Sequence, residues 1–117
     1  MSKIFIVMPA YNEAENIEVT IKQWYPVVEK LIALGNSAKL VIANDGSKDN
    51  TFAIMQVLKD QFPFLEGLDK PNSGHGATLL YLYRYAIENG ADYIFQTDSD
   101  GQTDPMEFWQ MWDNREK

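Results

Sequence analysis

The sequence predicts an α/β protein of three layers, in which helices cover both faces of a mostly parallel β-sheet. Short apolar runs at residues 4–8, 39–43 and 92–96, with a weaker one at 64–68, have the length and composition of buried strands. Stretches with apolar residues at helical spacing separate these runs, and the loops between them are short. Strands that alternate with helices form a parallel sheet, because right-handed crossovers place the helices on its two faces.

The first strand is predicted at Ile4–Met8, a continuous apolar run rich in β-branched residues. Pro9 follows it and is expected to end it, since proline lacks the backbone N–H that a strand donates.

A long amphipathic helix is predicted next. Asn12 is expected to cap it, and Glu13 and Glu15 suit its first turn, where the helix dipole favours acidic side chains. The helix is expected to end near Gly35, with a kink or break at Pro26. Its apolar residues recur at steps of three and four: Ile17, Ile21, Trp24, Val28, Leu31 and Ile32.

The second strand is predicted at Lys39–Ala43 and is followed by the polar stretch Asn44–Ser47. Either Asp49 or Asn50 can then cap a second helix. The apolar residues of that helix are Phe52, Ile54, Met55 and Leu58.

After the weak third strand, a loop over Lys70–Gly76 leads into a third helix, expected from about Ala77 to Asn89 and closed by Gly90. The fourth strand is predicted at Asp92–Gln96. Two dense sets of aromatic residues have helical spacing: Tyr81, Tyr83 and Tyr85, and Phe108, Trp109 and Trp112. Most of them are expected to lie in the core or at an interface, with Trp109 and Trp112 left half exposed.

Length and composition limit what the chain can be. Its 117 residues, 45% of them hydrophobic, fit one domain with its own core. A net charge of -7 argues against nonspecific binding to nucleic acid. There is no cysteine, and no apolar run is long enough to span a membrane, so a soluble, cytoplasmic protein is expected.

Polar residues follow the predicted strands at the edge where a parallel α/β sheet binds its ligands. Pro9–Glu13 follows the first strand, Asn44–Ser47 the second, and Asp98–Asp100 the fourth. Asp98 and Asp100 lie two residues apart, so their carboxylates point to the same side of an extended backbone and can bind a hard divalent cation, Mg²⁺ or Mn²⁺. The same residue types are also common in ordinary turns.

Several single residues in these loops have two possible roles. Asp45 can accept hydrogen bonds from a base or a ribose, or it can be a turn residue before Gly46. Tyr11 can pack along a base, and Glu13 can contact the nucleoside or simply serve a first helical turn. A phosphate-binding loop of the Walker type and a dinucleotide-binding glycine pattern after the first strand are both absent.

The glycine-rich stretch Asn72–Ala77 approaches a helix start, where free backbone N–H groups can receive an anion. A flexible connecting loop is the simpler interpretation. His75 is the only histidine in the chain, and it is expected to be a loop side chain rather than a catalyst.

Taken together, four segments resemble family 2 glycosyltransferases of the inverting type with the GT-A fold. They are PAYNEAENI at 9–17, NDGSKDNT at 44–51, NSGHGAT at 72–78 and TDSDGQTDP at 97–105. The last segment is most similar to enzymes that transfer a sugar from a nucleotide donor to a polyprenyl phosphate, of the dolichol-phosphate mannose synthase type. The resemblance covers nearly the whole chain and implies a nucleotide-diphospho-sugar transferase (GT-A) like fold.

This resemblance also implies roles for particular residues in binding a UDP- or GDP-sugar. The segment after the first strand lines the nucleoside pocket, and Asp45 recognises the base. Asp98 and Asp100 match the family's Asp-x-Asp element and are implied to bind the divalent cation, with Asp98 nearer the sugar and ribose and Asp100 the main metal ligand. Gln102 lies close to the donor phosphates. The implied donor-binding set is Pro9, Ala10, Tyr11, Glu13, Asp45, Gly74, Asp98 and Gln102.

The chain ends at Lys117, whereas members of the family continue with an acceptor-binding half that carries the candidate catalytic base and often membrane segments. Residues 1–117 are therefore expected to be a truncated, donor-binding portion with weak or no turnover and no assigned catalytic base. An exposed sheet edge makes a homodimer a further expectation. A full-length form of the protein is expected to associate with the inner face of the membrane.

Two other functions fit some of the same features. A sugar-phosphate nucleotidyltransferase has a related sheet but usually carries a glycine-rich, basic loop after the first strand, where this chain reads AYNEAEN. An acidic α/β signalling module of the receiver type binds magnesium at strand ends, but it needs a lysine after a late strand that this sequence lacks.

Overall fold

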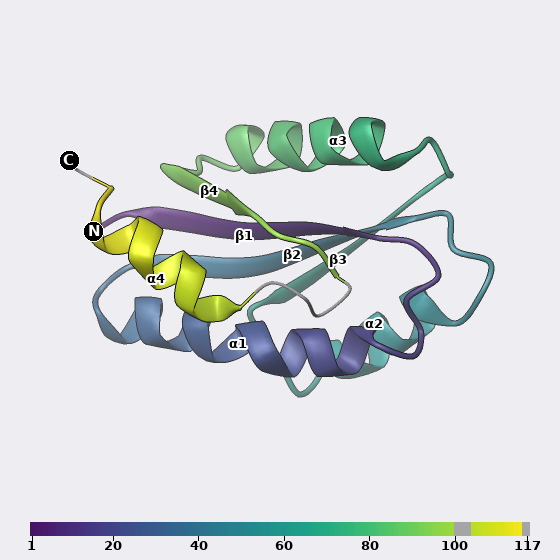
Figure 1. Cartoon of the computed structure of the whole chain (residues 1–117), viewed down its shortest axis with the longest axis horizontal. Helices are drawn as coiled ribbons and strands as arrows, with labels where there is room; N and C mark the ends of the chain where they lie inside the picture. The colour runs from purple at the N-terminus through teal and green to yellow at the C-terminus, as the bar shows by residue number, and fades with distance from the viewer. Residues whose placement is uncertain (100–103, 116–117) are drawn as a thin grey trace.

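The computed structural model describes residues 1–99 and 104–115 and contains a four-stranded sheet in the order β3-β2-β1-β4. The strands are β1 (Lys3–Ala10), β2 (Ser37–Asp45), β3 (Leu65–Lys70) and β4 (Tyr93–Gln96). Every neighbouring pair is parallel. The predicted parallel sheet is thus confirmed, with β1 and β2 at its centre (Figure 1).

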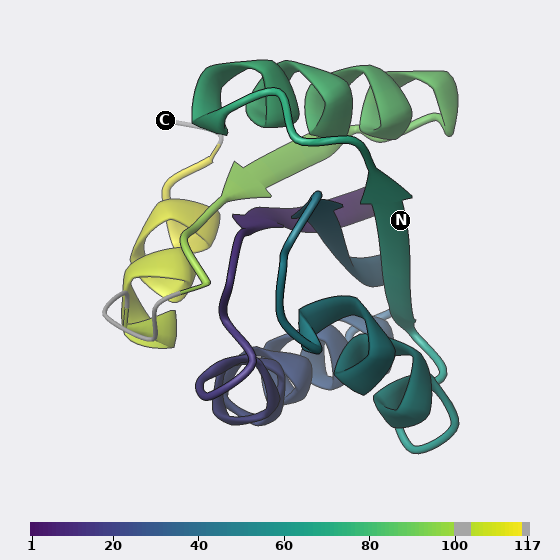
Figure 2. The ribbon, with the colours of Figure 1, turned by 90° about the vertical axis from the view of Figure 1, so that its right-hand side faces the viewer.

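Helices cover both faces of this sheet, as predicted. The helices are α1 (Ile17–Ala33), α2 (Thr51–Lys59), α3 (His75–Glu88) and α4 (Pro105–Asp113). Figure 2 shows α1, α2 and α4 on one face and α3 on the other. Among the described residues, no helix combines the length and the apolar character needed to cross a bilayer.

The core is divided by the sheet into two unequal parts. The larger part lies between the sheet and α1, α2 and α4, and Trp24 is its largest fully buried side chain. The smaller part lies under α3 and consists of Phe5, Val7, Val41, Ala43, Leu82 and Ala86. Alternate residues of β1 and β2 face the two parts, which explains why these strands are apolar throughout.

Pro9 lies inside β1 and does not end it, contrary to the sequence-based prediction. Val7 accepts a hydrogen bond from the Thr97 N–H at 3.0 Å, so Val7 faces β4. The backbone N–H and C=O groups of successive strand residues point to alternate sides, so Pro9 is the next residue whose backbone groups point toward β4. β4 has already ended at Gln96. The missing N–H of proline therefore leaves no strand partner unsatisfied.

The start of α1 also differs from the prediction. The helix begins at Ile17 with Asn16 at the N-cap position, so Asn12 is not its cap, and Glu13 and Glu15 precede its first turn. Asn12 has a φ of 54° and belongs to the loop before the helix. Pro26 does not break the helix, which continues to Ala33.

Other strand and helix boundaries differ by a few residues from those predicted from the sequence. β2 extends to include Asp45, so that residue ends a strand instead of forming part of a turn. Asp49 accepts a hydrogen bond from the Thr51 N–H at 3.0 Å, and Asn50 occupies the N-cap position of α2 without a capping side-chain bond. α3 begins at His75, two residues before the predicted start.

The second aromatic set lies on α4, which packs against β4 and α1. Phe108 is 2% exposed and its ring lies 5.2 Å from that of Phe95. Trp109 is half buried, as predicted, but Trp112 is buried, because its ring packs between Tyr93 and the guanidinium of Arg115. Asp104 caps this helix by accepting a hydrogen bond from the Met106 N–H.

Candidate functional site

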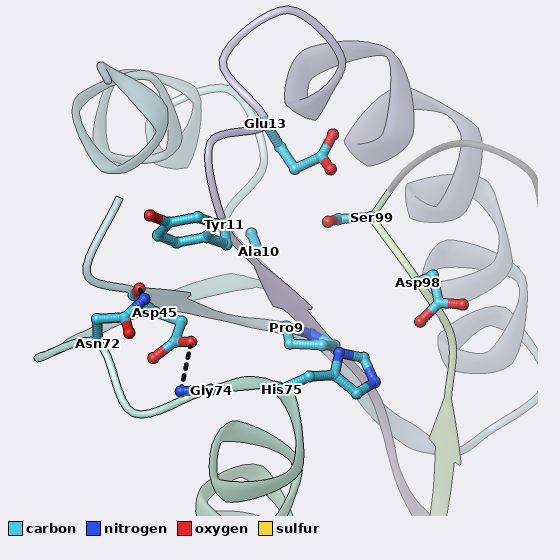
Figure 3. Close-up of a pocket in the computed structure, with 10 residues that line it drawn as sticks. All are labelled: Pro9, Ala10, Tyr11, Glu13, Asp45, Asn72, Gly74, His75, Asp98 and Ser99. Atoms are coloured by element: carbon cyan, nitrogen blue, oxygen red, sulfur yellow. Dashed lines mark hydrogen bonds between the residues drawn. The ribbon is translucent and has the colours of Figure 1, made fainter. Parts of the chain in front are cut away.

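A pocket of about 630 Å³ opens at the carboxyl ends of the strands, where polar loops from different parts of the chain meet. This volume lies within the range of about 300–1,000 Å³ that is usual for small-molecule sites. Figure 3 shows the lining side chains, which come from the ends of β1 and β2, the loops after β1 and β3, the start of α3 and the segment after β4. They are Pro9, Ala10, Tyr11, Glu13, Asp45, Asn72, Gly74, His75, Asp98 and Ser99.

Most of the predicted donor-binding residues lie in this one pocket: Pro9, Ala10, Tyr11, Glu13, Asp45, Gly74 and Asp98. Asp100 and Gln102 lie outside the described residues. Asp45, which ends β2, and Asp98, which follows β4, lie on the same side of the molecule and line a common space.

The loops after β1 and β2 are joined by hydrogen bonds. The Asn12 N–H donates to Ser47 Oγ at 2.9 Å, and the Lys48 N–H donates to Asn12 Oδ1 at 2.8 Å. Beside them, the Glu13 N–H donates to Thr51 Oγ1 at 2.9 Å. Tyr11 and Glu13 therefore lie on a loop whose position is fixed by the neighbouring loop.

Asp45, at the end of β2, is 4% exposed and has several hydrogen-bond donors around its carboxylate. Oδ1 accepts from Lys70 Nζ at 2.9 Å and from the Ser73 N–H at 2.8 Å, and Oδ2 accepts from the Gly74 N–H at 3.1 Å. Burial raises the pKa of this carboxyl group, but the bonds from Lys70, Ser73 and Thr78 together lower it below its ordinary value. Asp45 is therefore ionised at neutral pH.

Lys70, which the sequence analysis did not identify, holds this part of the site together. Its side chain is 10% exposed, and its ammonium donates to Asp45, to the Pro71 carbonyl at 2.8 Å and to the Ser73 hydroxyl. Lys70 ends β3 at the same sheet edge as the other site residues, a position that the structure shows and the predicted strand at 64–68 did not include.

The loop after β3 forms one wall of the pocket and is more than a connecting segment. Asn72 Nδ2 donates to the Asp45 carbonyl at 2.9 Å, and Gly46 lies directly against the Asn72 backbone. His75 lines the pocket as well, and it is the first residue of α3, whereas the sequence analysis expected it in a loop.

Asp98 and Ser99 form the opposite wall. Thr20 on α1 donates its hydroxyl to the Ser99 carbonyl at 3.0 Å, and this bond ties the segment after β4 to the helix. Asp98 is exposed to the pocket (Figure 3). Among the described residues no group of three acidic or histidine side chains could enclose a metal. A single carboxylate in an open pocket nevertheless suits Mg²⁺ or Mn²⁺, which is often bound by one or two carboxylates together with substrate phosphates.

Comparisons with known proteins give the family and the fold. Residues 5–114 match glycosyl transferase family 2. The chain is 29% identical over 108 residues to a dolichyl-phosphate beta-glucosyltransferase of Trichomonas vaginalis, and this alignment covers 90% of the chain and 31% of the relative. It is also 29% identical over 115 residues to a UDP-N-acetylglucosamine–dolichyl-phosphate N-acetylglucosaminyltransferase of Methanococcus voltae, covering 87% of the chain and 43% of the relative.

A third relative is the succinoglycan biosynthesis protein ExoA of Rhizobium meliloti, which is 35% identical over 98 residues, with coverage of 82% of the chain and 27% of that protein. Among solved structures, a mannosyltransferase of Pyrobaculum calidifontis in complex with GDP-Man and Mn²⁺ superposes with a TM-score of 0.66 and 21% identity, covering 85% of this chain and 28% of that one. The chain thus spans less than half the length of these relatives.

Proposed function

Because the chain belongs to glycosyl transferase family 2, we propose that its pocket binds the nucleotide part of a nucleotide-sugar donor, together with a divalent cation, for inverting sugar transfer. The observation that carries this proposal is the meeting of Tyr11, Glu13, Asp45 and Asp98 in one pocket at the carboxyl edge of a parallel sheet. Family membership favours this function over a nucleotidyltransferase or a signalling module.

Each wall of the pocket has a proposed role. Asp45 accepts a hydrogen bond from the base, and the Tyr11 ring, which is 43% exposed, packs along it. Glu13 accepts from the ribose hydroxyls. α3 begins at His75, and the N–H groups of its first turn would receive phosphate oxygens, whereas the Gly74 N–H already donates to Asp45.

Asp98 is the described residue that would hold the cation, and Asp100 is the second ligand that the sequence predicts. A bound Mg²⁺ or Mn²⁺ neutralises negative charge on the nucleoside diphosphate as it leaves. The presence of Mn²⁺ in the structure of the Pyrobaculum calidifontis mannosyltransferase supports this proposal.

The acceptor is proposed to be a polyprenyl phosphate. Two of the relatives carry dolichyl phosphate in their names, which supports that class of acceptor. A phosphate oxygen is already ionised at neutral pH, so its attack from the face of the sugar opposite the leaving group needs little proton removal. No catalytic base is proposed among the described residues.

Calorimetric titration of UDP and GDP into the chain, with Mn²⁺ and with EDTA, tests this function. Nucleotide binding is expected to require the metal. Asp98→Asn is expected to weaken metal-dependent binding by about tenfold or more, because it replaces an anionic ligand by a neutral amide.

The matched control for this experiment is Asp60→Asn. Asp60 is exposed at the end of α2, away from the pocket, so the same change of charge there should leave the affinity unaltered. Metal-independent binding, or equal binding by the wild-type chain and Asp98→Asn, would remove the proposed cation site. A folded chain that binds no nucleotide would refute the function as a whole.

A further inference from the structure

The hydroxyl of Thr20, on α1, is bonded to the segment that follows β4 and carries one wall of the pocket. We propose that Thr20 is a positioning residue: through the Ser99 carbonyl it fixes the place of Asp98, so that this carboxylate and the phosphates of the donor can share one divalent cation. The inference rests on the proposed nucleotide- and metal-binding function. Thr20 itself does not line the pocket.

Thr20 occupies a core position of α1 at which an apolar side chain would be expected. It is fully buried, on the same helix face as Ile17, Ile21 and Trp24. A hydroxyl at such a position costs free energy unless it is hydrogen-bonded. A threonine within a helix often donates to a carbonyl of the preceding turn, but Thr20 donates to the Ser99 carbonyl, 79 residues along the chain, at 3.0 Å. The polar atom therefore serves a contact between distant segments.

The segment after β4, residues 97–99, is held by one hydrogen bond on each side of Asp98. Before Asp98, the Thr97 N–H donates to the Val7 carbonyl at 3.0 Å. After it, the Ser99 carbonyl accepts from Thr20, and both residues are buried, so water has little access to this bond. The strand thus provides a backbone anchor for the segment, and Thr20 provides a side-chain anchor.

The position of Asp98 matters because a cation must reach it and the donor phosphates together. Asp98 lies on the wall of the pocket opposite Asp45 (Figure 3). Mg²⁺ demands oxygen ligands at about 2.0–2.1 Å in nearly octahedral geometry, and hydrogen bonds that orient the ligands strongly affect metal affinity. In the sequence, Ser99 stands between the two predicted cation ligands, Asp98 and Asp100. The bond from Thr20 therefore restrains the segment right beside the cation site.

Thr20→Val tests this role, because valine has a similar shape but no hydroxyl. Calorimetric titrations of UDP and of GDP at a series of Mn²⁺ concentrations give the Mn²⁺ concentration at which nucleotide binding is half-maximal. Thr20→Val is expected to raise that concentration by about tenfold, the lower end of the usual effect of outer-shell partners on metal affinity. Thr20→Ser keeps the hydroxyl and is expected to restore the Mn²⁺ requirement to near the wild-type value.

Thr97→Val is the matched control. It makes the same substitution at a buried position of the same segment, but the Thr97 hydroxyl has no hydrogen-bond partner among the described residues, so the Mn²⁺ requirement should not change. Urea unfolding of each variant separates positioning from stability. A merely structural role for Thr20 would lower the free energy of unfolding of Thr20→Val and leave the Mn²⁺ requirement of the folded chain at the wild-type value.

An unchanged Mn²⁺ requirement in Thr20→Val, or an equal increase in Thr20→Val and Thr97→Val, would overturn the proposal while leaving the nucleotide site intact. If Thr20→Val does not fold, Thr20→Cys takes its place, since a thiol is a weaker donor than a hydroxyl. Thr20→Cys is expected to need more Mn²⁺ than Thr20→Ser, and equal requirements would overturn the proposal. A folded wild-type chain that binds neither nucleotide would refute the proposed function, and this inference with it.

Discussion

Gly46 is the residue at which the site allows least change. It follows Asp45, has a φ of 61°, and a Cβ added there would lie 2.5 Å from the Asn72 backbone nitrogen. The close approach of two backbones brings the loop after β3 onto the end of β2, and only glycine permits it.

Gly46→Ala is therefore expected to destabilise the chain by about 2 kcal/mol or more, combining a left-handed backbone penalty with a steric clash. Urea unfolding measures the change. Gly35→Ala is the matched control, because Gly35 also has a positive φ, of 97°, but its added Cβ meets nothing within 4 Å. Equal losses in the two variants would show that the contact with Asn72 is unimportant.

At this scale, the sequence predicted the residues that stand next to chemically distinctive motifs. Tyr11, Glu13, Asp45 and Asp98 were all identified and all lie in the pocket, although their roles remain predictions. Lys70 was missed because its importance comes from contacts with residues that the fold brings near it, and a lone lysine at a strand end carries no pattern.

At the level of elements, α4 depends on a few aromatic contacts. Phe108 packs against Phe95 of β4, Trp109 and Trp112, with ring centroids 5.2, 5.1 and 6.0 Å away. The contacts hold α4 over the short edge strand β4, which leads directly to Asp98.

Phe108→Ala is expected to cost about 3–5 kcal/mol of unfolding free energy, because it leaves a cavity between α4 and β4. Met111→Ala, on the same helix and 61% exposed, should change stability by no more than about 0.5 kcal/mol. Chemical denaturation of both variants measures the difference. A loss below about 1 kcal/mol for Phe108→Ala would contradict the packing described here.

The elements themselves were largely predictable, since hydrophobic periodicity decides which face of each is buried. Boundaries were less so. The end of β1 depends on its pairing with β2, which continues to Ala10, and the start of α1 depends on Asn12 being engaged by the loop that carries Ser47 and Lys48. Both boundaries depend on contacts between residues far apart in the sequence, and the local sequence pattern does not predict such contacts.

The whole molecule should lose stability in acid, through two aspartates near the site. Burial raises the Asp45 pKa, but stronger hydrogen bonding lowers it overall, and the hydrogen bond from Thr51 lowers the pKa of Asp49. A carboxyl group whose pKa is lowered on folding stabilises the folded state above its unfolded pKa, here 3.8, and that contribution is lost as the pH falls through the lower folded value.

We therefore expect the free energy of unfolding to fall below about pH 4, and to fall less steeply in Asp45→Asn and Asp49→Asn. Urea unfolding between about pH 7 and pH 2 measures the slope. Asp60→Asn, at an exposed position outside the pocket, should keep the wild-type slope. Identical acid profiles in all four proteins would refute this account.

The paired loops after β1 and β2 also determine where the chain can accept new residues. Backbone-to-side-chain hydrogen bonds join the two loops through Asn12, Ser47 and Lys48. An insertion at 47–48 would break these bonds and displace both loops. The turn at residues 34–36 lies between α1 and β2, at the opposite ends of the strands from the pocket, and among the described residues its backbone N–H groups bond to the last turn of α1. A tag or fused domain placed in that turn would leave the binding surface as it is, which makes it the natural position for a reporter.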